Sequence, residues 1–141
     1  MSSSIDYQIE PDLDVESFID VLRRSTLAER RPVEDRDRME TMLRGANLIA
    51  TARHEGRLVG VARALTDFSF CTYLSDLAVD EAYQKRGIGK ALLNQIREAS
   101  GPDVTTLILL AAPKAVDYYP HIGLTRHDSC WTIPAGTKPT T

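Results

Sequence analysis

An amphipathic helix set between two apolar, strand-like segments constrains the fold of this 141-residue chain more than any other feature. The segments Cys71–Val79 and 104–111 are rich in β-branched and apolar residues. Between them, apolar residues recur at helical spacing over residues 88–99, and Gly101-Pro102 ends the pattern. This order predicts two parallel strands joined by a helix, and the almost wholly apolar segment 104–111 predicts a strand covered on both faces.

The residues before this unit predict one strand, two helices and a hairpin, because the hydrophobic period changes from two to 3.6 and back. Asp12 or Asp14 is the expected cap of the first helix, and Pro32 suits the first position of the second, which ends at Gly45. The predicted ranges are 5–10 (strand), 15–22 (helix), 32–45 (helix), and 47–54 and 57–66 (two strands joined by a tight turn at Glu55-Gly56).

The last part of the chain predicts a short helix and two closing strands. Pro113 opens the helix, and Pro120 is expected to end it after Tyr119. Residues 124–126 and 130–133 are the predicted strands. The order β-α-α-β-β-β-α-β-α-β-β predicts an α/β (α+β) fold with a mixed, mostly antiparallel sheet, as one domain over residues 1–134 with a polar tail at 135–141.

Composition and charge argue against several classes of protein. The chain is 43% hydrophobic and 26% charged with a net charge of −3. It therefore lacks the excess of basic residues with which proteins bind nucleic acids or acidic lipids. Its apolar runs are far shorter than the roughly 20 residues of a membrane span, and its N-terminus does not resemble a signal peptide, which predicts a cytoplasmic protein. The spacing of Cys71 and Cys130 fits neither a metal site nor a disulfide framework, and both lie in apolar, strand-like runs, which predicts buried free thiols. The three scattered histidines predict no metal site.

The turn between strand and helix has the composition of an anion site. In Gln84-Lys85-Arg86-Gly87-Ile88-Gly89-Lys90-Ala91, two glycines leave backbone N–H groups uncovered, and the following helix adds its unpaired N–H groups and positive dipole end. A P-loop would need Gly at Gln84 and Ser or Thr at Ala91, and a dinucleotide fingerprint would need Gly at Leu92. Without further motifs, a purely structural strand-to-helix turn explains the glycines equally well.

The run from Leu74 to Leu93 resembles the acyl-CoA motif of the GNAT N-acetyltransferase superfamily. Gln84, Gly87 and Gly89 match its Q/R-x-x-G-x-G/A core, and Leu77 and Val79 match the Leu-x-Val end of the preceding strand. A Tyr four residues before a Gly, another family feature, is matched by Tyr119 and Gly123. The resemblance covers nearly the whole chain. One departure is Ala112, followed by Pro113, where many members carry Asn, so one side-chain contact to the cofactor is in doubt.

The resemblance implies a V-shaped opening between the strands that end near Val79 and Leu110. Pantetheine of acetyl-coenzyme A would lie there like a missing strand, against main chain at Leu77, Ala78 and Val79. The pyrophosphate would lie on the N–H groups of residues 86–90. The implied cofactor-binding residues are Leu77, Ala78, Val79, Gln84, Lys85, Arg86, Gly87, Ile88, Gly89 and Lys90.

The family mechanism is direct attack of an amine on the thioester. The backbone N–H of Val79 would polarise the carbonyl, and Tyr119 would protonate the departing sulfur as the general acid. Asp76 is one candidate for the base, through a water; Tyr73, Glu29 and a chain of waters are the others. Strict alternation puts Asp76 on the opposite face of the strand from Tyr73, unless a bulge re-aims the strand.

The expected activity is transfer of an acetyl group from acetyl-CoA to a primary amine of a small molecule or peptide. Glu29 would attract a cationic amine, whereas Arg30, Arg31 and Arg126 would hold a carboxylate, unless all four are solvated loop charges. The alternatives are a non-catalytic acyl-CoA-binding module and a protein-interaction domain whose glycine loop is only a turn. Trp131 lies on the last predicted strand. Either the edge of this strand pairs with a second copy of the chain in a homodimer, or Trp131 covers the core.

Overall fold

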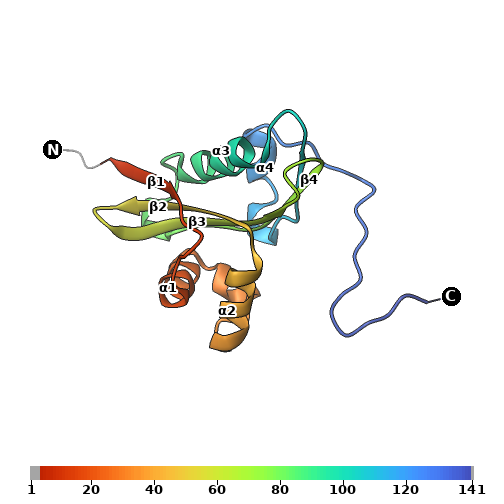
Figure 1. Ribbon diagram of the computed structural model, residues 1–141, viewed down its shortest axis with the longest axis horizontal. Helices are drawn as coiled ribbons and strands as arrows, with labels where there is room; N and C mark the ends of the chain where they lie inside the picture. Colours follow the sequence, from red (N-terminus) through yellow and green to blue (C-terminus); the bar gives the residue numbers. More distant parts are fainter. Residues whose placement is uncertain (1–3, 141) are drawn as a thin grey trace. The chain divides into compact units, whose positions relative to one another are not determined.

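A five-stranded sheet in the order β1-β2-β3-β4-β5 forms the centre of the first part of the chain (Figure 1). The computed structural model describes residues 4–140, and the chain divides into two units, Met1–Leu110 and Ala111–Thr141. Strands β1 to β4 pair antiparallel in sequence order, and β5 pairs parallel to β4. The mostly antiparallel sheet and the parallel strand–helix–strand unit predicted from sequence are both confirmed.

The first unit contains helices on both faces of this sheet. Figure 1 shows α1 and α2 on one face and α3 on the other. The elements are β1 (Ile5–Ile9), α1 (Val15–Ser25), the 3-10 turn η1 (Leu27–Arg30), α2 (Arg36–Gly45), β2 (Leu48–His54), β3 (Arg57–Thr66), β4 (Cys71–Val79), η2 (Glu81–Tyr83), α3 (Ile88–Ser100) and β5 (Thr106–Leu109). No helix among the described residues is long and apolar enough to cross a membrane.

Both N-terminal helices begin at an aspartate cap. The carboxylate of Asp14 accepts the Ser17 N–H at 2.9 Å at the start of α1. Helix α2 begins at Arg36, later than predicted, because Asp35 caps it by accepting the Arg38 N–H at 3.1 Å. Pro32 lies instead in the preceding turn, where its carbonyl accepts the Asp35 N–H.

The core on the first face packs α1 and α2 against the middle of the sheet. Its fully buried side chains include Phe18, Leu22, Met39, Leu43 and Val61. On the other face, α3 approaches β3 closely at Gly60. A Cβ at Gly60 would meet Leu92 Cδ1 at 3.0 Å and Ile88 Cγ2 at 3.2 Å, so a larger residue would have to push these side chains away by a few tenths of an ångström. The helix at the glycine loop is thereby fixed onto the sheet.

Strand β5 is shorter and less covered than the sequence predicted. The N–H groups of Val104 and Thr105 both donate to the Gly101 carbonyl, which keeps these residues in the turn that follows α3. Only Thr106–Leu109 pair with β4. The side chains of β5 alternate between exposed and half-buried, and Ile108 is 48% exposed. The prediction of a strand covered on both faces is therefore wrong.

The second unit contains η3 (Pro113–Ala115) and the short helix α4 (Tyr118–His121). Pro120 lies inside α4 rather than ending it, because a first-turn residue needs no N–H partner. Gly123 ends the helix in the left-handed region at φ 100°. The N–H of Leu124 donates to the Tyr119 carbonyl and that of Gly123 to Pro120, which is a Schellman cap. This cap gives a physical reason for the spacing of Tyr119 and Gly123.

The two predicted closing strands do not form within residues 111–140. Residues 124–126 and 130–133 make no ladder there, and a strand without a partner ladder is not stable. Trp131 is 88% exposed, so it does not cover the core. Both cysteines are free and exposed, which corrects the prediction of buried thiols.

Candidate active site

Strands β4 and β5 separate halfway along β4. The four residues from Cys71 to Leu74 pair with Thr106–Leu109, whereas β4 continues for five more residues to Val79 without a partner on that side. The opposite edge of β4 stays paired with β3 as far as Val79. The result is an opening at the sheet edge, where the sequence analysis expected one between Val79 and Leu110.

The main-chain groups of Leu77 and Val79 point into this opening. The N–H of Asp80 donates to the Val59 carbonyl at 2.8 Å, on the β3 side. In an antiparallel ladder, the backbone N–H and C=O groups of successive residues point alternately toward the partner strand and away from it. Those of Ala78 therefore point toward β3, like the N–H of Asp80, and those of Leu77 and Val79 point toward the open edge. The side chain of Ala78 lies in the core. Of the predicted run 77–79, Leu77 and the N–H of Val79 therefore offer free main chain, whereas the Val79 carbonyl accepts a hydrogen bond from Gln84.

A bulge lies in β4 where the strands separate. Arg63 on β3 pairs with Asp76 and the next residue, Ala64, pairs with Leu74, which leaves Ser75 as the extra residue. Leu65, two residues after Arg63 and so on the same face, pairs with Tyr73. Asp76 and Tyr73 are therefore on the same face of the sheet, the one covered by α1 and α2. Strict alternation gave the opposite arrangement, and the bulge corrects it.

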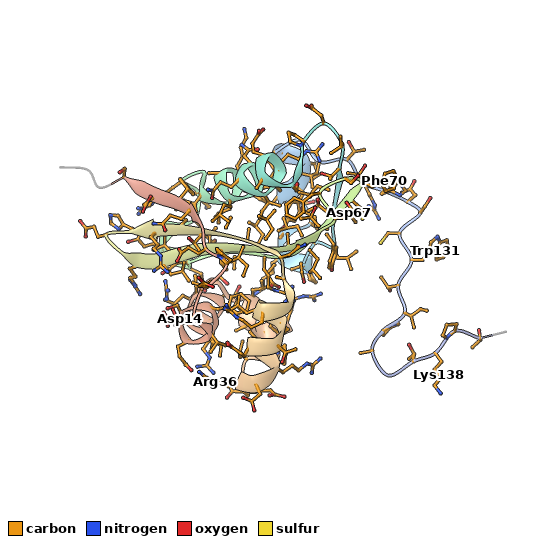
Figure 2. All side chains as sticks on the ribbon, in the orientation of Figure 1. Asp14, Arg36, Asp67, Phe70, Trp131 and Lys138 are labelled. Carbon is orange, nitrogen blue, oxygen red and sulfur yellow. The ribbon has the colours of Figure 1, made fainter. Side chains whose placement is uncertain are left out.

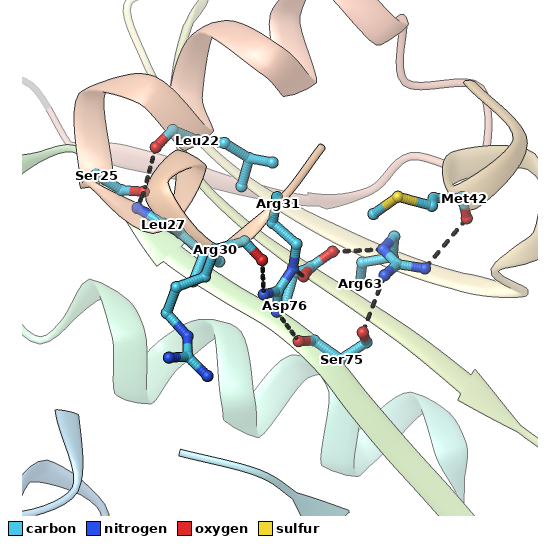
Figure 3. Close-up of polar contacts among 9 residues, drawn as sticks. All are labelled: Leu22, Ser25, Leu27, Arg30, Arg31, Met42, Arg63, Ser75 and Asp76. Carbon is cyan, nitrogen blue, oxygen red and sulfur yellow. Dashed lines mark hydrogen bonds and ion pairs between the residues drawn. The ribbon is translucent and has the colours of Figure 1, made fainter. Parts of the chain in front are cut away.

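The Asp76 carboxylate is buried between two guanidinium groups (Figure 3). Arg31, directly after η1, donates from Nε to Asp76 Oδ1 at 2.6 Å, and Arg63 donates from Nε to Oδ2. The remaining nitrogens of both arginines bind main chain and the bulge. Arg31 Nη2 reaches the Ser75 carbonyl at 2.8 Å, Arg63 Nη2 reaches Ser75 Oγ at 2.9 Å, and Arg63 Nη1 reaches the Met42 carbonyl at 3.1 Å.

This arrangement argues against Asp76 as the base predicted from sequence. Both of its oxygens accept charge-assisted hydrogen bonds, and its side chain has no exposed surface from which to reach a water at the amine. The contacts instead join the α1–α2 connector, α2 and the β4 bulge. Arg63 was not predicted from the sequence, although an arginine flanked by apolar residues in the middle of the strand 57–66 indicates a buried ionic partner. Arg31 was predicted to hold a carboxylate of the substrate, and it binds the carboxylate of Asp76 instead.

A second buried ion pair fixes the far end of β4. Arg24 of α1 donates to Asp80 Oδ2 and to the Leu58 carbonyl, the latter at 2.6 Å. Burial alone would raise the pKa of Asp80, but hydrogen bonds from the Ala82 N–H and from Arg24 outweigh it and hold the pKa below its ordinary value. The ionised Asp80 thus anchors the strand end immediately before the glycine loop.

The glycine loop leaves the start of α3 without a side-chain cap. Gly87 is the N-cap residue at φ 81°, and no side chain accepts the first N–H groups of the helix. Lys85 is also left-handed, at φ 64°. Residues 84–87 are exposed, the Ile88 side chain is buried beneath them, and a Cβ at Gly87 would meet nothing within 4 Å. Gln84 Nε2 donates to the Val79 carbonyl at 3.1 Å, which joins this loop to the open edge of β4.

These residues fit a pyrophosphate bound beside pantetheine. Uncapped N–H groups at the positive end of a helix bind phosphate oxygens, and Lys85, Arg86 and Lys90 add exposed positive charge. Arg86 is further held over the Tyr83 ring, 5.0 Å from its centroid, and Tyr83 Oη lies 2.6 Å from His54 Nδ1. Neither Tyr83 nor His54 was predicted as part of the site. The contact joins Tyr83 to the end of β2 at the β2–β3 hairpin, about 30 residues earlier in the chain, so local sequence does not reveal it.

Tyr119, the predicted general acid, belongs to the second unit. It is half-buried in α4 and its ring contacts that of Tyr118, with centroids 5.3 Å apart. Burial raises the pKa of the Tyr119 hydroxyl above its ordinary value, and the neighbouring Tyr118 adds to the rise. Tyr119 therefore keeps its proton at neutral pH, which a general acid requires.

Comparisons with known proteins agree with this geometry. The family model of the acetyltransferase (GNAT) domain matches residues 20–131. The chain is 35% identical over 82 residues to the uncharacterized N-acetyltransferase ycf52 of Gracilaria tenuistipitata var. liui, covering 57% of this chain and 42% of that protein. The chain thus matches less than half the length of the curated relatives that it resembles.

Two solved structures share the fold over nearly the whole chain. The GNAT family protein SP0256 of Streptococcus pneumoniae TIGR4 superposes with a TM-score of 0.72 at 18% identity, covering 96% of this chain and 100% of that one. The aminoglycoside N-acetyltransferase AAC(6')-Iy, solved in complex with CoA, gives 0.74 at 14% identity, covering 97% and 98%. The α/β fold and the family resemblance are confirmed.

An open strand edge joined to an uncapped, glycine-rich helix start is the geometry expected of a GNAT acetyltransferase domain. The chain belongs to the GNAT acetyltransferase family.

Proposed function

We propose that the protein transfers an acetyl group from acetyl-CoA to a primary amine, by direct attack within a ternary complex. The observation that supports this most is the open edge of β4 from Ser75 to Val79, continuous with the glycine loop through Gln84. An extended amide chain along Leu77 and Val79 would replace the missing strand pairing. Bound acetyl-CoA supplies the activated thioester.

After acetyl-CoA and the amine bind, a backbone N–H and a tyrosine hydroxyl of this chain assist the transfer. The N–H of Val79, free of strand pairing, polarises the thioester carbonyl. As the C–N bond forms and the C–S bond breaks, Tyr119 donates its proton to the sulfur, and the amine loses its proton to solvent. Asp76 does not take that proton in this scheme. Its ion pairs with Arg31 and Arg63 hold the bulge that separates β4 from β5.

Calorimetric titration with acetyl-CoA tests the cofactor site. In Gly89→Glu, a carboxylate enters the proposed pyrophosphate position, and we expect affinity to fall by at least roughly tenfold with the melting temperature nearly unchanged. Asn94→Glu adds the same charge at an exposed position of α3 and should bind as the wild type does. Unchanged affinity in a folded Gly89→Glu protein would refute the site.

Turnover of Tyr119→Phe tests the general acid. The substitution removes the hydroxyl and keeps the ring, so we expect kcat to fall by roughly 10²–10⁴-fold with acetyl-CoA affinity nearly unchanged. Full activity would mean that water protonates the sulfur. Release of thiol in an amine-library screen separates the enzyme from a non-catalytic acyl-CoA-binding module, which would bind acetyl-CoA without releasing thiol. The homodimer and the cytoplasmic location stay predictions.

A further inference from the structure

The loop before α3 contains a backbone conformation that a turn or cap of its own does not explain. Among the described residues, those other than glycine with a positive φ are Thr26, Glu55, Phe68 and Lys85. The first two lie in the cap of α1 and in the β2–β3 turn. Phe68 lies in a turn in which the Asp67 carboxylate accepts the N–H groups of residues 69–71, and these hydrogen bonds lower the pKa of Asp67 to about 2. Figure 2 shows Asp67 and Phe70 of this turn at one end of the sheet.

Lys85 has no such local reason for its positive φ. A side chain disfavours this conformation, and it persists where surrounding contacts hold it. Gln84 is extended, at φ −69° and ψ 161°, and Lys85 follows at φ 64°, an order typical of the central pair of a type II turn. This turn brings Arg86 back over Tyr83, with the guanidinium carbon 5.0 Å from the centroid of the Tyr83 ring. At this distance the face of an aromatic ring attracts a cation.

Tyr83 is itself fixed through both its main chain and its hydroxyl. Its N–H donates to the Asp80 carbonyl at 2.8 Å, and Asp80, paired with Arg24, caps the short helix η2 that contains Tyr83. Its hydroxyl lies 2.6 Å from His54 Nδ1 at the end of β2, and the two rings meet edge to face with centroids 5.4 Å apart. The Tyr83 ring is therefore a platform anchored to the sheet, under a loop that is otherwise exposed.

The charge of Arg86 is held in place without being neutralised. In the part of the chain that the structure describes, no carboxylate pairs with Arg86 and none of its N–H donors is hydrogen-bonded. Lys85 and Lys90, the other cations of the loop, have no contact within residues 4–140 that would fix them. A guanidinium binds two phosphate oxygens at once through its planar fork of donors. Arg86 directly precedes Gly87, the N-cap residue of α3, so its side chain is within reach of a phosphate at that helix start.

Fixing an arginine before the ligand arrives increases the affinity that it contributes. A long side chain that becomes ordered only on binding loses rotamer freedom, and this loss is subtracted from the strength of the new ion pair. The contact with Tyr83 orders Arg86 in the free protein already. More of the attraction between Arg86 and a phosphate then appears as affinity.

We propose that Tyr83 and His54 are positioning residues that hold the Arg86 guanidinium for the pyrophosphate of acetyl-CoA. This inference rests on the acetyl-CoA binding proposed above and adds two residues that act through a third. The pyrophosphate is the expected partner because it is assigned to the N–H groups that follow Gly87 directly. Pantetheine, which carries no phosphate, should bind without help from Tyr83.

Binding of three ligands to the full-length protein tests this proposal without any need for turnover. The ligands are CoA, 3'-dephospho-CoA, which keeps the pyrophosphate, and pantetheine, measured by competition with CoA. In Tyr83→Leu we expect Kd to rise by roughly threefold to tenfold for the first two and to stay within about twofold for pantetheine. Tyr83→Phe and His54→Ala keep the ring under Arg86 and remove its hydrogen bond, so the rise should be smaller, roughly twofold. Tyr7→Leu, the same change at a half-buried tyrosine of β1, should alter none of the three.

A double-mutant cycle separates positioning from a structural role. Arg86→Ala should raise Kd for CoA by roughly tenfold, as for loss of a charged hydrogen bond. In that background Tyr83→Leu should change Kd by less than about twofold, because no guanidinium is left to hold. If Tyr83 only maintained the fold of the loop, its loss would weaken CoA binding equally with and without Arg86.

Four results would overturn the proposal: unchanged CoA affinity in Tyr83→Leu, additive losses in the double variant, an equal loss for pantetheine, or a loss for CoA that is absent for 3'-dephospho-CoA. The last result would place Arg86 at the 3'-phosphate. In each case binding of CoA by the wild type would leave the proposed function standing. Absence of that binding in the wild type would refute the proposed function instead.

Discussion

The two halves of β4 differ in how their edges are used. From Cys71 to Leu74 the strand is paired on both sides, with β3 and with β5. From Ser75 to Val79 it is paired with β3 alone, and the other edge is open. The change occurs at the Ser75 bulge, which Arg31 and Arg63 bind from the α1–α2 side.

This difference separates stability from function within one strand. Backbone groups in the paired half are hydrogen-bonded to the neighbouring strands, so substitutions there are expected to affect folding. Free backbone groups in the open half are available to a ligand, and an exposed strand edge of this kind is otherwise a liability that proteins cover. Acetyl-CoA would cover it. The following experiments test this division in order of decreasing effect.

Removing the ion pairs at the bulge should have the largest effect on stability. In Asp76→Ala, the Arg31 and Arg63 guanidinium groups lose their buried partner, and we expect the free energy of unfolding in urea to fall by about 3–5 kcal/mol. Glu16→Gln, at the exposed pair with Arg36, should change it by less than about 1 kcal/mol. Equal, small losses in both variants would mean that the bulge does not depend on Asp76.

Removing one N–H from the open edge should cost activity and little stability. Val79→Pro removes the N–H that faces the opening, and we expect kcat to fall by roughly 10²–10³-fold, as for loss of one carbonyl-polarising donor. Ala78→Pro removes the neighbouring N–H, which binds β3, and should lower the free energy of unfolding by about 1–3 kcal/mol or more. Steady-state kinetics and urea unfolding distinguish the two. If both variants lose only stability, the edge is not used in the reaction.

Gly87, in the loop that follows the open half, should be needed for the stability of the fold because of its backbone conformation. Gly87→Ala adds a Cβ that meets no atom within 4 Å, but at φ 81°, so we expect a loss of about 1–2 kcal/mol. Gly45→Ala also adds a Cβ in open space, but in a helix without positive φ, and should stabilise the protein by up to about 1 kcal/mol. Melting curves of the two variants should therefore shift in opposite directions.

Asp67→Asn, in the turn before the paired half, should have the smallest effect on stability, and its dependence on pH should appear only in acid. Because the pKa of Asp67 in the folded protein, about 2, lies below its ordinary 3.8, its ionised form stabilises the fold. This contribution is complete above about pH 4 and is lost as the pH falls toward 2. The difference in melting temperature between wild type and Asp67→Asn should shrink over that range. A difference that does not change with pH would show that the turn does not depend on the charge.

Local sequence determined most of the elements and the phosphate loop. The strand boundaries of Arg57–Thr66 and Cys71–Val79 agree with the prediction, as does the hairpin turn, in which Glu55 and Gly56 both have positive φ. Helix α3 and its glycine start follow from period and composition. These features depend on residues a few positions apart, so the sequence contains the relevant interactions.

Only the tertiary structure decided which residues face the site. The bulge at Ser75 reverses the alternation along β4, and it is held by Arg31 and Arg63, which lie 44 and 12 residues away in the chain. The same contacts turn Asp76 from a candidate base into a buried ionic partner. The strands predicted at 124–126 and 130–133 are a second case, because a strand needs a partner edge and none pairs with them among the described residues. Hydrophobic periodicity reports which face is apolar, but ion pairs and strand pairing form between residues that become neighbours only when the chain folds.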